Sequence, residues 1–274
     1  MATTTNPQTP EGGFGPALRG RLAAPLEILA FMGRAIFETR GAWRYSAEIM
    51  RQTALLITGS VLVLVVLQMV MGGICGIFGN YALRSLGASD ATGYFTALCD
   101  RSTPLVMCGY VLSAKVGCGL VAEIGSMKIS DELDAFRSVG LDPMRFVVAT
   151  RLVAVWLVLP LFYCVSQFAA EAGSYISVVH VIGEVSQGTW EGTHWPLRST
   201  TDLWLNLIQF FTIGSTVVLV AMYYGYTVPP GGPPAVGAAT ARSMILNLVL
   251  VHVIYGAFSL AFYGGGNVML PVGG

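Results

Sequence analysis

The first long uncharged run in the chain constrains its fold more than any other feature. No charged residue lies between Arg51 and Arg84, and the segment from Leu55 to Phe78 is rich in Leu, Val, Ile and Met. A helix of about 20 apolar residues can cross a bilayer. The composition agrees, because 54% of the residues are hydrophobic and 11% are charged, against roughly 25% charged residues in soluble domains. The run therefore predicts a membrane-spanning helix.

Four more apolar segments follow, and together they predict an all-α integral membrane protein. The five expected transmembrane helices cover about residues 53–78, 94–122, 146–179, 203–224 and 243–263. They fall within one five-helix membrane domain at residues 51–264. We expect residues 1–20 to form a disordered cytoplasmic tail and residues 265–274 an external tail.

Basic residues are distributed unequally between the two sides of the five expected spans. Counted with the adjoining span ends, the N-terminal segment and the connections after spans two and four carry 11 Lys and Arg residues, against 3 on the other side. Cytoplasmic segments are enriched in Lys and Arg, so we expect a cytoplasmic N-terminus and an external C-terminus. Residues 21–50 combine leucines near helical spacing with arginines. They predict an interfacial amphipathic helix, with an ordinary juxtamembrane linker as the alternative.

A polar connection at residues 125–145 is predicted to contain a short helix at about 129–140. Ser130 is a favourable N-cap, and acidic residues follow in the first turn, where the helix dipole favours them. Gly140 and Pro143 then stop the helix. Its apolar residues lie along one side: Leu133, Phe136 and Val139. Such a helix either docks into a groove of a cytoplasmic partner or merely closes a loop, and the residue pattern leaves both readings open.

Lys115 lies deep inside the second expected span. A charge at that depth is expensive and usually faces a partner or water. It could pair with Glu123, with Glu171 or with a lipid headgroup. The alternatives are snorkelling to the interface or a structural ion pair.

Several kinds of site find no support in the residue patterns. The five cysteines form no CxxC pair or zinc spacing, and most lie in apolar runs, where we expect them to behave as small apolar residues. The three histidines also lack a metal-ligand spacing, so no metal is expected. A net charge of zero gives no electrostatic case for nucleic acid. Without a P-loop motif, the chain is not expected to bind ATP or another cofactor itself.

Two segments resemble a known family. The run Glu123-x-Gly125-x-Met127, followed by Asp131-Glu132-x-Asp134-Ala135 and then Gly140-x-Asp142-Pro143, is similar to the signature of the MlaE/YrbE permeases. Asp131 stands where that signature usually has Glu. The resemblance extends to Tyr223–Tyr226 and to the turn with Gly231, Gly232 and Gly237, so it spans most of residues 40 to 263.

The resemblance implies an assembly and a task. MlaE/YrbE permeases are the membrane subunits of ABC transporters that work with MCE proteins and move lipids. The implied partners are a dimer of ATPase subunits, which holds the ATP and Mg, and a hexamer of MCE proteins on the outer face. A second YrbE-type permease completes the membrane part, with a heterodimer preferred because the Tyr223–Tyr226 run looks most like the second paralogue of actinobacterial pairs. The implied location is the plasma (inner) membrane.

The resemblance also assigns roles to the short helix. Glu132 and Asp134 are expected to bind basic or amide groups in a groove of the ATPase, and Leu133 and Phe136 are expected to be the apolar anchors. The remaining residues of this coupling segment are Asp131, Arg137, Gly140, Asp142 and Pro143. The motif residues outside it are Glu123, Gly125, Met127, Gly231, Gly232 and Gly237.

Two other classes of function compete with a non-catalytic permease. An ion-coupled secondary transporter needs intramembrane acids and often an inverted repeat, whereas this chain has few such acids and an odd number of expected spans. An intramembrane lipid-modifying enzyme needs clustered His, Asp or Ser residues at one membrane depth, and the sequence offers no such cluster.

Overall fold

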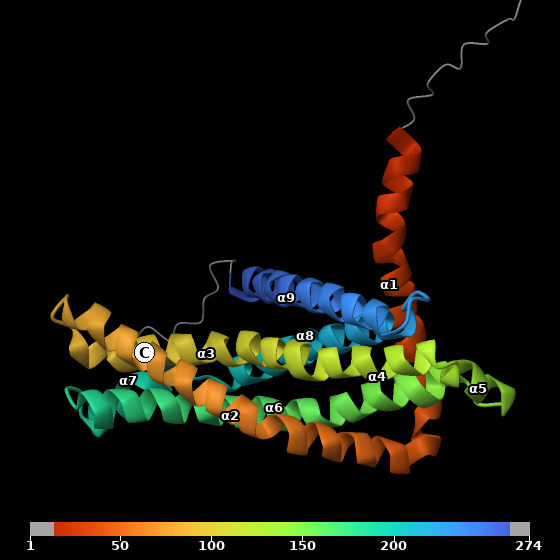
Figure 1. Cartoon of the computed structure of the whole chain (residues 1–274). Helices are drawn as coiled ribbons and strands as arrows, with labels where there is room; N and C mark the ends of the chain where they lie inside the picture. Colours follow the sequence, from red (N-terminus) through yellow and green to blue (C-terminus); the bar gives the residue numbers. More distant parts are fainter. Residues whose placement is uncertain (1–13, 264–274) are drawn as a thin grey trace, which may run out of the picture.

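The computed structural model describes residues 14–263, and the side chains of residues 25–262 (Figure 1). Its α-helices are α1 (Phe14–Ala42), α2 (Ser46–Arg84), α3 (Thr92–Val111), α4 (Cys118–Ile129), α5 (Glu132–Ser138), α6 (Thr150–Tyr175), α7 (Gln187–His194), α8 (Thr200–Tyr226) and α9 (Pro233–Tyr263). Residues 1–13 of the expected N-terminal tail and the expected external tail at 265–274 lie outside the described residues.

Short helical segments of other types continue or join these helices. Three are 3-10 turns: η1 (Trp43–Tyr45), η2 (Ser89–Ala91) and η6 (Trp195–Leu197). Three are π-helical: η3 (Leu112–Gly117), η4 (Met144–Ala149) and η5 (Ile176–Ile182). As a result α3, η3 and α4 form one continuous rod, and so do η4, α6 and η5.

Five helical stretches within residues 25–262 are long and apolar enough to cross a membrane. They cover residues 25–84, 89–129, 144–182, 200–226 and 233–262. The expected class, an all-α integral membrane protein with five spans, is confirmed. The fifth helix begins well before residue 243, at Pro233, because proline is favourable in the first turn of a helix.

The bundle of five spans has two distinct ends (Figure 1). We call one the α5 end, where α5 follows α4 and where α1 contacts η4 and α8. We call the other the α7 end, where α7 packs against α3 and η2. The polar connections therefore gather at the two ends, and the helices between them present long apolar surfaces.

The centre of the bundle is built on a close contact between α2 and α6. An added Cβ at Gly72 would lie 1.9 Å from the carbonyl oxygen of Ala170, and one at Gly173 would lie 2.0 Å from that of Met69. Small residues allow membrane helices to approach until their backbones touch. Gly72 and Gly173 are therefore packing residues, and α6 lies at the core with 72% of its most apolar window buried.

Helix α1 runs across the direction of the five spans and projects from the α5 end (Figure 1). Phe31 contacts the rings of Tyr223 and Tyr226, with centroids 5.6 and 5.8 Å away, and Glu38 forms an ion pair with Arg145 at 2.8 Å. Four large apolar side chains on the same helix remain exposed: Leu26, Leu29, Ile36 and Phe37. An exposed apolar surface on a helix that crosses the spans agrees with the expected interfacial position, which remains a prediction.

The expectation that the cysteines of the apolar runs act only as small apolar residues is wrong for two of them. Cys75 on α2 and Cys99 on α3 form a disulfide with their Cα atoms 6.3 Å apart, in the half of the bundle near the α7 end. Spacing alone could not reveal this pairing, because it depends on how α2 and α3 lie side by side. Cys108, Cys118 and Cys164 are free.

Candidate functional site

The start of α5 differs from the sequence-based expectation. Ser130 was predicted to cap the short helix, but its hydroxyl donates to the carbonyl oxygen of Ser126 at 2.9 Å and so closes α4. Asp131 occupies the N-cap of α5 instead, in the left-handed conformation with φ of 59°. Aspartate tolerates that conformation better than most residues. The chain thus turns sharply at Asp131 between two helices, and α5 spans Glu132–Ser138 rather than 129–140.

The end of α5 agrees with the expectation. Gly140 has a φ of +80°, its N–H donates to the carbonyl of Arg137 at 3.1 Å, and the N–H of Leu141 donates to that of Phe136 at 3.0 Å. This pair of bonds is a Schellman motif, which favours glycine at its left-handed position. Asp142 then accepts a bond from the N–H of Met144 at 3.0 Å and starts the third span.

The apolar side of α5 faces the bundle itself. Leu133 is only 2% exposed, and the ring of Phe136 lies 5.2 Å from that of Phe146. The prediction that Leu133 and Phe136 anchor a partner is therefore corrected: they hold α5 against its own permease. Periodicity shows which side of a helix is apolar, but it does not show which surface covers that side.

The outward side of α5 carries acidic groups and one apolar residue. Asp131, Glu132 and Asp134 are exposed, and so is Val139, at 71%. Asp134 is paired with Arg137 at 2.8 Å and lies 4.0 Å from Lys128. Glu132 accepts a bond from the hydroxyl of Ser130 at 3.1 Å. The surface available to another protein is therefore acidic, with Val139 as its exposed apolar residue.

The two segments that resemble the family signature meet in space, although about 100 residues separate them in the sequence. An added Cβ at Gly125 would lie 3.0 Å from Val236 and 3.2 Å from Val228, so this glycine allows the turn to pack on α4. Gly232 in the turn has a φ of +68°, which favours glycine. Gly237 lies in α9 with no atom within 4 Å of an added Cβ, and nothing in the structure requires a glycine there.

A cavity of about 550 Å³ lies where these segments meet. Its lining comes from the end of α4, the turn at Asp131 and the residues between α8 and α9: Lys128, Ile129, Asp131, Val228, Pro229, Pro230, Gly231, Gly232 and Pro233. The cavity adjoins the acidic surface of α5, because Asp131 belongs to both.

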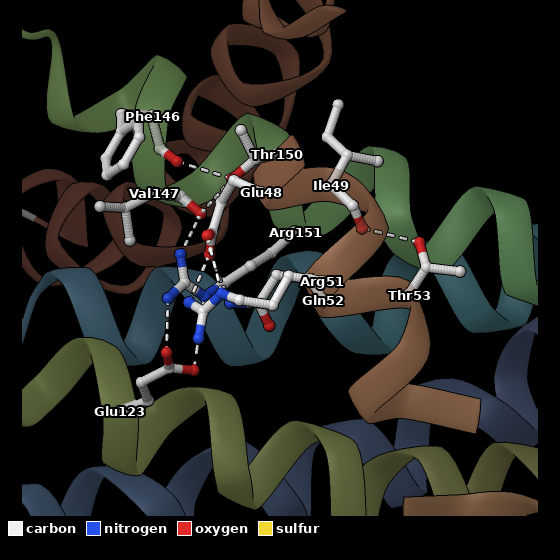
Figure 2. A network of polar contacts seen from close by, with 10 residues as sticks. All are labelled: Glu48, Ile49, Arg51, Gln52, Thr53, Glu123, Phe146, Val147, Thr150 and Arg151. Atoms are coloured by element: carbon white, nitrogen blue, oxygen red, sulfur yellow. Dashed lines mark hydrogen bonds and ion pairs between the residues drawn. The ribbon is translucent and has the colours of Figure 1, made fainter. Parts of the chain in front are cut away.

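Glu123, the first residue of the signature, ties the second span to the third. It forms an ion pair with Arg151 at 2.5 Å, and Arg151 also donates to the carbonyl of Val147 at 2.9 Å. Figure 2 shows this pair beside Glu48 and Arg51 of α2, which pair with each other at 2.7 Å. Arg151 was missed as a site residue. An arginine inside an expected span was the available signal, because a charge there needs a partner.

Removing the Glu123 carboxylate is expected to destabilise the permease. Arg151 is 4% exposed, so Glu123→Gln leaves a buried guanidinium without its anion. Breaking a buried pair costs about 3–5 kcal/mol, and we expect about 3 kcal/mol because Glu123 itself is 42% exposed. The measurement is thermal or denaturant unfolding of the purified chain in detergent. Glu48→Gln is the matched control and should change little, because its partner Arg51 is 61% exposed.

A second network of charges lies toward the α7 end. Arg101 pairs with Asp202 at 2.6 Å, Arg198 pairs with Glu171, and Asp100 accepts a bond from Ser174 at 2.7 Å. These contacts join α3, α6 and α8 and the segment before α8. Glu171 and Glu123, two of the partners that the sequence offered to Lys115, are therefore both bound to arginines.

His194 of α7 makes the stability near this network depend on pH. The ring is fully buried, stacks on Trp190 at 4.3 Å and lies 3.0 Å from the hydroxyl of Thr96. Burial, helped by the positive charge of Arg198, lowers the pKa of His194 from 6.5 to about 4. The unfolded chain therefore binds a proton that the folded one does not. The stability is fully present above pH 6.5 and is lost as pH falls toward 4, by about 3 kcal/mol.

The test of this pH dependence compares the chain with its His194→Gln variant in unfolding experiments from pH 4 to pH 8. The stability difference between the two should shrink as the pH falls below about 6.5. Taking the difference removes the contribution of the neighbouring carboxyl groups. A difference that stays constant over this range would contradict the assignment.

The fold and its two ends define a polytopic all-α membrane protein with a short, firmly held helix at one end. The chain belongs to the MlaE permease family, because the family model described as "Permease MlaE" matches residues 49–261. The match includes both signature segments and all of α3 to α8, so the family inferred from the motifs is confirmed.

Named relatives agree with this family. The intermembrane phospholipid transport system permease protein MlaE of Haemophilus influenzae is 23% identical, over 85% of this chain and 95% of its own length. A "Probable ABC transporter permease protein" of Synechocystis sp. is 25% identical, over 67% of this chain and 70% of its own. The chloroplastic protein TRIGALACTOSYLDIACYLGLYCEROL 1 of Arabidopsis thaliana is 25% identical, over 66% of this chain and 51% of its own.

Proposed function

We propose that this chain is the non-catalytic membrane subunit of an ATP-driven, MCE-associated lipid transporter, and that α5 couples it to the ATPase. The observation that carries the proposal is the division of α5 into two sides, with Leu133 buried in the permease and the acids exposed. Family membership and the names of the relatives support transport of lipid. ATP and Mg would then bind to the partner ATPase, and this chain would hold no cofactor.

The connections of α5 suit it to transmit motion. The turn at Asp131 joins it to α4, and the Schellman motif with the Asp142 cap joins it to the start of the third span. Phe136 packs on Phe146 of that same span. A displacement of α5 therefore acts on the second and third spans together, because both of its connections to them are short and hydrogen-bonded.

The acidic surface of α5 is the proposed contact with the ATPase. Glu132 and Asp134 bind basic or amide groups there, and Val139 supplies the apolar contact that was expected from Leu133 and Phe136. The neighbouring cavity of about 550 Å³ offers room for a side chain of the partner. Charge complementarity of this kind sets the choice of partner and the rate of docking.

The α5 end is proposed to be cytoplasmic in the plasma membrane, with the MCE hexamer at the α7 end. The uneven count of 11 and 3 basic residues supports this orientation. A second YrbE-type permease, preferably a different paralogue, completes the membrane part. The exposure of α9 supports such pairing, because only 11% of its most apolar window is buried.

Purification of the tagged chain from its native membrane tests the proposal. A nucleotide-hydrolysing subunit and an MCE protein should accompany it, and lipid transfer in the reconstituted complex should stop without ATP. Transfer that an ionophore abolishes, while removal of ATP does not, would favour the ion-coupled transporter instead.

The side of the membrane is tested separately with Val139→Cys, in a background with Cys118→Ala and Cys164→Ala. An impermeant maleimide should label Val139→Cys in inverted vesicles and not in intact cells. Labelling from outside the cell would reject both the orientation and the coupling role.

A further inference from the structure

We propose that Lys115 forms a binding site for the anionic head of a membrane amphiphile, a carboxylate or a phosphate, in a cavity between α2 and the η3–α4 segment. The cavity has a volume of about 230 Å³. It is lined by Gln52, Leu55, Leu56, Gly59 and Ser60 from α2, and by Lys115, Val116, Gly119, Leu120 and Glu123 from the facing rod. The proposal concerns binding alone and does not depend on an ATPase.

The ammonium group of Lys115 lies at membrane depth. Lys115 precedes Glu123 by eight residues in one continuous rod, a distance of about 12 Å along the helix axis. Its side chain does not extend to the α5 end, because its Nζ lies 3.9 Å from the position of an added Cβ at Gly59. Gly59 follows Arg51, the last charged residue before the uncharged run, by eight residues. Snorkelling, one of the alternatives from the sequence, is therefore not the conformation of Lys115.

No carboxylate within residues 25–262 pairs with Lys115 at 4.0 Å or less. Glu123 lines the same cavity, but Arg151 binds both of its oxygens, at 2.5 and 3.4 Å. Glu171 is bound to Arg198 in the network toward the α7 end. A charge inside the bilayer needs a counter-charge. Both carboxylates that the sequence suggests as partners of Lys115 are thus paired with arginines. The lipid headgroup is the remaining candidate.

The backbone around Lys115 is unusual as well. Lys115 lies in η3, a π-helical segment, and π turns inside helices occur frequently at functional sites. The side chain of Lys115 is exposed rather than packed. Gln52 and Ser60 add an amide and a hydroxyl to the lining, so the head of an amphiphile would meet polar groups around the ammonium.

The surface beside the cavity suits an apolar tail. Residues that follow Gly59 at intervals of three and four lie on the same face of α2. The exposed members of this set include Leu62, Val63, Val66, Leu67 and Val70. This row leads from the cavity toward the α7 end, so an amphiphile with its head at Lys115 can lay its tail along α2.

The test uses photoreactive lipids on the full chain in nanodiscs without nucleotide. The probes are a diazirine fatty acid, a diazirine phosphatidylglycerol and a diazirine fatty alcohol, and mass spectrometry locates the labelled residues. Both the cavity and the α2 row should be labelled by at least one anionic probe and much less by the alcohol. Whichever anionic probe labels more strongly identifies the source of the head, carboxylate or phosphate.

Variants connect the labelling to the lysine. Lys115→Met should lower anionic labelling about tenfold, the loss expected for one charge-assisted hydrogen bond, whereas Lys115→Arg should retain it. Gly59→Leu keeps Lys115 and fills the cavity, so it should also prevent labelling even if Lys115→Met folds poorly. Lys128→Met removes the other lysine of the chain and should leave labelling unchanged.

Two results would overturn the proposal. One is equal labelling of the cavity by the alcohol and the anionic probes. The other is a carbodiimide cross-link from Lys115 to a carboxylate of a second permease in the native complex, which would make Lys115 a protein contact.

Discussion

Glu132→Lys combined with Asp134→Lys is expected to abolish ATP-driven lipid transport by the assembled complex. The two acids lie on the exposed side of α5, and reversing their charges places cations opposite the basic groups proposed for the ATPase groove. Losing a charge pair at an interface costs about 2–5 kcal/mol, so affinity for the ATPase should fall at least about thirtyfold. The measurements are co-purification of the ATPase and lipid transfer in proteoliposomes.

Two controls separate docking from folding in this experiment. Glu132→Gln with Asp134→Asn removes the charges without reversing them and should give an intermediate loss. Glu191→Lys reverses an exposed acid of α7 at the opposite end and should leave the ATPase bound. Full coupling in the double Lys variant would reject the role assigned to α5, provided that its unfolding temperature matches that of the parent.

Gly173→Val is expected to prevent the bundle from forming in its present packing. An added Cβ would lie 2.0 Å from the carbonyl oxygen of Met69 and 3.0 Å from the backbone nitrogen of Gly73. These are backbone atoms, so no side chain can rotate away to make room. Overpacking usually costs about 1–3 kcal/mol, and we expect at least about 3 kcal/mol here because α2 must shift as a whole.

The folded yield in detergent and the unfolding temperature measure this effect. Gly256→Ala is the matched control on α9, where no atom lies within 4 Å of an added Cβ. It should be neutral or slightly stabilising, because alanine favours helix. A folded Gly173→Val variant with unchanged stability would show that α2 and α6 do not touch at this point.

The sequence was sufficient for the features that depend on local pattern. Apolar runs predicted five spans, and a glycine after a helical stretch predicted the stop at Gly140, where the φ is +80°. The family signature identified the permease, which the family match over residues 49–261 confirms. Each of these follows from composition or from neighbouring residues.

The features that the sequence did not reveal depend on contacts between distant segments. Leu133 shows an apolar side without showing that the permease's own core covers it. Cys75 and Cys99 meet only because α2 and α3 are adjacent. In the sequence Arg151 is one more basic residue, and only the fold places Glu123 beside it. Serine is a favourable N-cap residue, but because the chain turns at Asp131, Ser130 ends the preceding helix α4 instead.

The disulfide between Cys75 and Cys99 prevents a passage for lipid from opening between α2 and α3 at its position. It fastens α2 to α3 in the half of the bundle near the α7 end, so these two helices cannot part there while it is intact. Any gate in that half must lie between this joined pair and other helices or a second permease. Nearer the α5 end no disulfide joins α2 to the rod of α3, η3 and α4.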